Sequence, residues 1–124
     1  MPDETRLNDN GEAFLRKIVG ARLTSVQFVL NYLILGFDER VALTTLVWPE
    51  LFDGRTAWKF GMPGYRDQLC ELIEQIVETL DLTPEETIII GLANKTQMRI
   101  ALGSYKRPGE RAIFTTPPHG LWVW

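Results

Sequence analysis

Residues 32–37 read YLILGF, and 55 positions later residues 87–92 read TIIIGL. Both stretches are rich in residues that favour β-strands, and both place a glycine one position before the end. At this offset, from Gly36 onward, four pairs of identical residues meet: Gly36 and Gly91, Gly54 and Gly109, Ala57 and Ala112, Pro63 and Pro118. Glycine and proline mark special backbone positions, so the pattern predicts an internal duplication with halves of about 11–63 and 64–118.

Each half is predicted to begin with a short helix. In the first half Asn8–Asp9–Asn10 offers an N-cap, apolar residues follow at helical spacing, and Gly20 closes the segment. In the second half one apolar stripe includes Tyr65, Leu69, Leu72, Ile73 and Ile76. Periodicity alone allows this helix to reach residue 80. Since an offset of 54 aligns residues 77–82 with the strand expected at 23–28, we predict a strand there instead.

An antiparallel β-meander of about four strands is expected after each helix, which makes the chain an internally duplicated α+β protein. Besides the strands already named, β-rich runs cover residues 41–48, 97–102, 56–60 and 111–115. Residues 119–124 are predicted to form a C-terminal tail strand paired into the main sheet, with at least one tryptophan facing the core. Residues 1–10 are polar and expected to be loosely ordered, which leaves one domain over residues 11–124.

Composition argues against several classes of partner. The chain has 124 residues, 45% of them hydrophobic and 23% charged, and its net charge is −3, so no basic field attracts nucleic acid. Its longest apolar run, Tyr32–Phe37, is too short to span a membrane. One cysteine and an acidic, polar beginning are typical of a cytoplasmic protein, which is the location we expect.

Residues for catalysis are scarce. His119 is the one histidine, and the one thiol, Cys70, is predicted to be buried and unreactive on the apolar side of the second helix. Glu85–Glu86 follows Thr83–Pro84, where acidic residues favour a turn or first helical turn more than a metal site. We therefore expect no catalytic residues, no metal and no cofactor, and a protein that is not an enzyme.

Aromatic residues are the most distinctive side chains. Strand alternation places Trp58 with Phe60 on one face, and Trp122 with Trp124 on another. Most of the aromatic rings are expected to fill the core, but these two pairs are also candidates for a contact surface.

Two motifs resemble a small bacterial domain family of unknown function with two β-rich halves. They are Leu72–Ile73–Glu74–Gln75 and the ending Pro118–His119–Gly120–Leu121–Trp122–Val123–Trp124, with His119 where the family pattern has a second glycine. The resemblance implies a non-catalytic binding protein of immunity or accessory type with a protein partner. The alternatives are a homodimer in which a second copy pairs by edge strands, and a small-molecule binder with a pocket between the halves.

Overall fold

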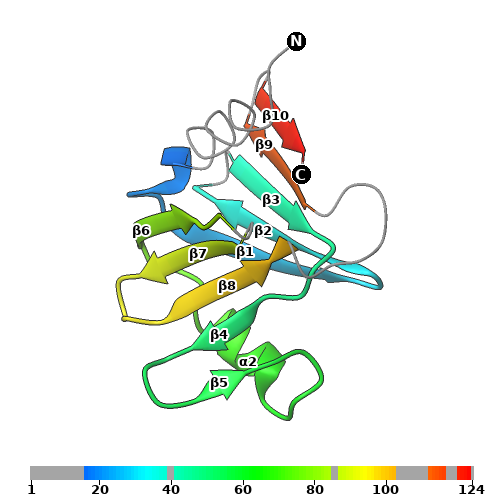
Figure 1. Cartoon of the computed structure of the whole chain (residues 1–124), viewed down its shortest axis with the longest axis vertical. Coiled ribbons are helices and arrows are strands. Elements are labelled where there is room, and N and C mark those ends of the chain that lie inside the picture. Colours follow the sequence, from blue (N-terminus) through cyan, green and yellow to red (C-terminus); the bar gives the residue numbers. More distant parts are fainter. Residues whose placement is uncertain (1–15, 39–40, 85–86, 103–111, 117–119, 124) are drawn as a thin grey trace.

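Two antiparallel sheets of five strands each, with very little helix, make up the part of the chain that the structure describes (Figure 1). This computed structural model describes residues 16–38, 41–84, 87–102, 112–116 and 120–123, the last two ranges by their backbone. The elements in chain order are η1 (Arg16–Ile18), β1 (Leu23–Val29), β2 (Tyr32–Phe37), β3 (Val41–Thr45), β4 (Glu50–Phe52), β5 (Ala57–Trp58), α2 (Tyr65–Cys70), β6 (Val77–Leu82), β7 (Thr87–Leu92), β8 (Gln97–Ala101), β9 (Ala112–Thr116) and β10 (Gly120–Val123).

Each sheet combines strands from both parts of the chain. The first sheet has the order β1-β2-β3-β9-β10, and the second has the order β5-β4-β8-β7-β6. Three consecutive strands therefore form a meander, and the hairpin that follows them crosses to the edge of the other sheet. The expectation of about four meander strands within each half is corrected here. A self-match cannot distinguish the two arrangements, because a hairpin has the same pattern whichever sheet it joins.

Backbone hydrogen bonds repeat around the point where β1 and β6 begin. Arg22 and Ile76, which are 54 positions apart, form an antiparallel bridge there. The flanking bonds occur in pairs related by the same offset. They are Gly20 N–H to Val77 O (2.8 Å) with Glu74 N–H to Leu23 O (2.7 Å), Val77 N–H to Ala21 O (2.8 Å) with Leu23 N–H to Gln75 O (2.9 Å), and Val19 N–H to Arg16 O with Ile73 N–H to Cys70 O (both 3.1 Å).

A strand irregularity and its opposing glycine also occur twice. The register shifts between Leu23 and Ser25 in β1, and between Val77 and Thr79 in β6. A Cβ on Gly36 would lie 2.3 Å from the Ser25 hydroxyl oxygen, and one on Gly91 would lie 2.2 Å from that of Thr79. The two glycines that match in the sequence are therefore each opposed by a hydroxyl group from the shifted strand.

After β3, residues that are 55 positions apart no longer occupy equivalent places in the two sheets. Ala57 lies in β5 at a sheet edge, whereas Ala112 lies in β9, between β3 and β10. The pairing instead matches Leu51 with Phe114, since Leu51 is opposite Met98 of β8 and Phe114 is opposite Leu43 of β3. The identity of Ala57 with Ala112 therefore does not mark equivalent positions, because the loop before β9 is longer than the loop before β4.

Buried side chains from both sheets form one shared core. This core includes side chains from β2, β3, β7 and β8. Each of the four is at most 1% exposed: Leu35, Leu43, Ile90 and Met98. Residues 77–82 are the strand β6, as predicted, and β10 pairs with β9, as expected for the tail strand. No helix in the described part of the chain is long and apolar enough to cross a membrane.

The second helix is shorter than its apolar stripe suggested, and this corrects the prediction for Cys70. Tyr65, Leu69 and Leu72 are buried, but α2 ends at Cys70, and the thiol side chain is exposed. Cys70 is one residue beyond Leu69, about 100° further around the helix, so it lies off the buried stripe. For the first helix, only its end at η1 falls within the described residues.

Candidate functional site

Four aromatic side chains from separate segments form a stack, which we call the aromatic ladder: Phe28, Trp48, Phe60 and Tyr65. The Trp48 and Phe60 rings are nearly parallel, with centroids 4.2 Å apart and an interplanar angle of 16°. The Phe28 and Trp48 centroids are 6.4 Å apart with an interplanar angle of 18°, and Tyr65 meets Phe60 edge-on at 6.0 Å. Aromatic pairs attract one another at centroid distances of about 4.5–7 Å, and the Trp48–Phe60 pair is slightly closer than this.

Tyr65 anchors the ladder to the fold. Its side chain is 2% exposed, and its hydroxyl group donates a hydrogen bond to the carbonyl oxygen of Pro49. Pro49 directly precedes β4, so this bond connects α2 to the hairpin that crosses between the sheets. Burial raises the pKa of the Tyr65 hydroxyl, because an apolar environment disfavours the phenolate.

The loop from β5 to α2 presents Phe60 at the surface. Backbone hydrogen bonds from Met62 to Lys59 (3.0 Å) and from Tyr65 to Met62 (3.1 Å) fold this loop into consecutive turns. Phe60 is 49% exposed and Met62 is 41% exposed, so both apolar side chains remain open to a partner. Because one face of the Phe60 ring is held against Trp48, the exposed ring has less freedom to lose when something binds it.

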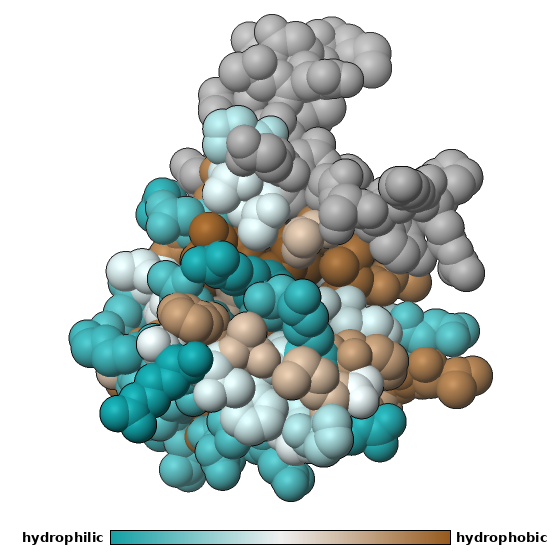
Figure 2. Space-filling view, turned by 60° about the horizontal axis from the view of Figure 1, so that its bottom comes forward, coloured by the Kyte–Doolittle hydropathy of each residue, from teal (hydrophilic) through white to brown (hydrophobic). Residues whose placement is uncertain are grey.

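A hollow of about 190 Å³ lies beside the exposed ring. The residues that line it are Phe60, Gly61, Met62, Gly64, Tyr65, Arg66 and Asp67. The guanidinium carbon of Arg66 lies 5.5 Å from the centroid of the Phe28 ring, a cation–π distance. Figure 2 shows this end of the molecule, where hydrophobic surface gathers on the side of the β1–β2 turn and hydrophilic residues cover most of the rest.

The residues proposed from sequence for a contact surface are not all in this site. Trp58 is only partly exposed, packs against the core and lies under Gly64, whose added Cβ would be 3.1 Å from the indole. Phe60 belongs to the ladder. Trp122 lies in β10, where only the backbone is described, and Trp124 lies outside the described residues.

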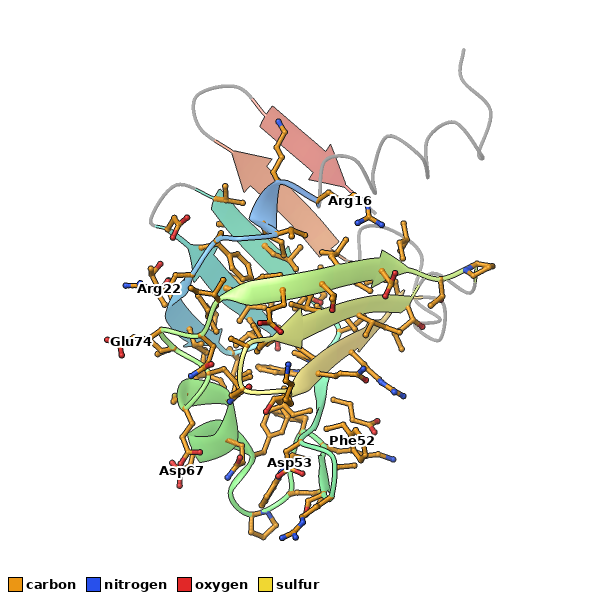
Figure 3. All side chains as sticks on the ribbon, turned by 90° about the vertical axis from the view of Figure 1, so that its left-hand side faces the viewer. Arg16, Arg22, Phe52, Asp53, Asp67 and Glu74 are labelled. Atoms are coloured by element: carbon orange, nitrogen blue, oxygen red, sulfur yellow. The ribbon has the colours of Figure 1, made fainter. Side chains whose placement is uncertain are left out.

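A tight turn at Asp53 neighbours Trp58 at the tip of the β4–β5 hairpin (Figure 3). One carboxylate oxygen of Asp53 accepts hydrogen bonds from the backbone N–H groups of Thr56 and Arg55, both at 2.8 Å. These bonds, the first from Thr56, hold the pKa of Asp53 below its usual value. The Trp58 indole N–H favours the same ionised form, although it makes no bond of full hydrogen-bond geometry. Asp53 therefore has a structural role.

Sequence reasoning missed the partners of Phe60. Trp48, Tyr65 and Arg66 were not among the proposed surface residues, and no local pattern connects a loop residue at 60 with rings at 28 and 48. His119 lies outside the described residues. Within the described residues, no group of three or more histidine, cysteine or acidic side chains is placed to hold a metal ion.

A second hollow, of about 340 Å³, lies on the outer face of the first sheet. Tyr32, Ile34, Thr44 and Leu46 line it, all uncharged and all partly exposed. It is mostly apolar, with the hydroxyl groups of Tyr32 and Thr44 as its polar side-chain groups and no charged group among these residues.

Comparison of the chain with protein-family models, curated proteins and solved structures finds no match. Functional argument therefore depends on the side chains of this chain.

Proposed function

We propose that the protein is a non-catalytic binding domain that holds a protein partner through the aromatic ladder. The observation that carries this proposal is the half-exposed Phe60 ring, 49% open to solvent and stacked at 4.2 Å on Trp48. Aromatic side chains fixed in this way are typical of the residues that contribute most to protein–protein binding. The resemblance to a bacterial accessory family, with His119 as its departure, supports the same class of function and remains part of the proposal.

The test uses short random peptides displayed on phage and selected on the immobilised full-length protein. We expect enriched peptides to lose at least about tenfold in affinity toward Phe60→Ala, since truncating a central interface ring typically costs more than about 1.4 kcal/mol. Phe52→Ala is the matched control, because Phe52 is also exposed, at 36%. Phe52 lies in β4, and Figure 3 shows it on the opposite side of this end of the molecule from Asp67 of α2. Enriched peptides that bind Phe60→Ala as tightly as the native protein would refute the proposal.

We also propose that the chain arose by internal duplication, with the hairpin of each half exchanged between the sheets. The support is one bridge between residues 54 positions apart, the flanking hydrogen bonds that recur at the same offset, and the opposed glycines that recur at an offset of 55. Each sheet takes strands from residues on both sides of Pro63. Fragments 1–63 and 64–124 are therefore expected to fold only when produced together, as a one-to-one complex seen by light scattering and circular dichroism. Two fragments that fold separately as monomers would contradict the exchange.

A further inference from the structure

The charges beside the aromatic ladder indicate what kind of peptide the surface accepts. Arg66 and Asp67 both line the hollow next to Phe60. Within the described residues, neither side chain has an ion-pair partner. Both side chains are exposed, and they differ in how they are held.

Arg66 is fixed in position by its stacking contact. Its guanidinium carbon is 5.5 Å from the Phe28 centroid, and Phe28 itself stacks on Trp48. A guanidinium group that lies over a ring still directs its N–H donors outward in its own plane, where a carboxylate can accept two of them. Asp67 has no such contact, and its carboxylate is free to turn toward water.

We infer that the hollow binds a peptide segment that carries a large apolar side chain next to an aspartate or glutamate. The apolar side chain contacts Phe60 and Met62, and the acidic side chain pairs with Arg66. This inference depends on the proposed binding function and adds the chemistry of the partner. Asp67 lowers the affinity for such a peptide, because its negative charge lies at the same hollow and repels the incoming carboxylate.

Two substitutions with opposite expected effects on affinity test this inference, one that removes a positive charge and one that removes a negative charge. Both are measured with the peptides selected above. With synthetic peptides from the enriched pool and fluorescence anisotropy at low salt, Arg66→Gln is expected to weaken binding about tenfold, since a charge-assisted pair contributes roughly 1.5 kcal/mol or more. Asp67→Asn is expected to strengthen binding about twofold. Arg66→Lys keeps the charge without the planar fork and is expected to fall between the native protein and Arg66→Gln. Melting curves of all variants confirm that each is folded.

The outcomes separate the inference from the function on which it depends. Peptides that need Phe60 but show no enrichment in acidic residues, and that bind Arg66→Gln normally, overturn the inference and leave the binding function intact. Binding that Asp67→Asn weakens and Arg66→Gln strengthens also overturns it, because the partner would then be basic. Selection that yields no Phe60-dependent peptide refutes the binding function and the inference together.

Discussion

The two sheets share a hydrogen-bonding plan but have different outer faces. In the first sheet the register aligns Gln27, Ile34 and Thr44 across β1, β2 and β3, a row without charge. The equivalent row of the second sheet is Asp81, Ile89 and Arg99, followed by Glu50 in β4. Inner positions are apolar in both sheets apart from Thr45 of β3, because they fill one core. Outer positions vary freely, since the backbone bonds do not depend on them.

The aromatic ladder follows the same rule at the edge of the core. Phe28 in β1 corresponds at the 54-residue offset to Leu82 in β6, which has no ring to stack. Among the described residues, the ladder therefore has no counterpart at the matching positions of β6. The comparison indicates that the candidate site arises where the two sheets differ, although their backbone hydrogen bonds recur.

The largest expected effect tests whether the two sheets contribute equally to the shared core. Leu35 and Ile90 are both fully buried at matching positions of β2 and β7. Leu35→Ala and Ile90→Ala should each lower the free energy of unfolding by about 3 kcal/mol, because each removes buried methyl groups and leaves a cavity. Urea unfolding of the two variants measures this. A difference of more than about 2 kcal/mol between them would show that the sheets carry unequal parts of the core.

The opposed glycines sharpen the comparison. Gly91→Ala should lower the free energy of unfolding by about 2 kcal/mol, because the new Cβ meets the hydroxyl of Thr79, and one of the two other rotamers of this β-branched side chain would place its methyl group there instead. Gly36→Ala should cost less, since Ser25 can move its hydroxyl to another rotamer. Unfolding midpoints give both values, and the double variant Thr79→Ser with Gly91→Ala should recover part of the loss. Equal costs for the two glycines would rule out this explanation.

Tyr65 tests the hydrogen bond that connects α2 to the residue before β4. Tyr65→Phe removes the hydrogen bond to Pro49 and should lower stability by about 1 kcal/mol at neutral pH. The folded state raises the pKa of this hydroxyl above its ordinary value of 10.0, so its contribution is complete below pH 10 and decreases at higher pH, where the unfolded chain ionises more readily. Melting temperatures from pH 8 to 11 should therefore fall more steeply for the native protein than for Tyr65→Phe. Parallel pH profiles would contradict the assignment.

The smallest expected effect concerns the backbone at matching turns. Gly20 and Glu74 both have left-handed backbone angles, with φ of 89° and 84°. Glycine adopts this region readily and glutamate does not, so Glu74→Gly should stabilise the fold by up to about 1 kcal/mol. The entropy that glycine adds to the unfolded chain reduces this gain. Gly20→Ala should destabilise it by about 1 kcal/mol, with no clash to explain the loss. Thermal denaturation would reveal a wrong sign for either change.

Most strands could be predicted from the sequence because their signals are local. Tyr32–Phe37 and Thr87–Leu92 are short runs of residues that favour strands, and β6 was recognised by its offset from β1. The short strand β4 was missed, since Glu50–Phe52 has only three residues and its partner in β8 is far along the chain. Cys70 was misplaced because it directly follows Leu69 and therefore lies about 100° around α2 from the buried stripe.

By itself, the sequence determined where most strands form and that Gly36 and Gly91 occupy matching positions, since these signals are read from the local residue types and from the 55-residue offset. Only the tertiary structure decided that the hairpins cross between the sheets, because the same hairpin can pair with either edge. That crossing brings the β3–β4 connection, with Trp48 and Pro49, close to α2. Ring contacts between residues 28, 48, 60 and 65 depend on how distant segments pack, and no local spacing in the chain encodes them.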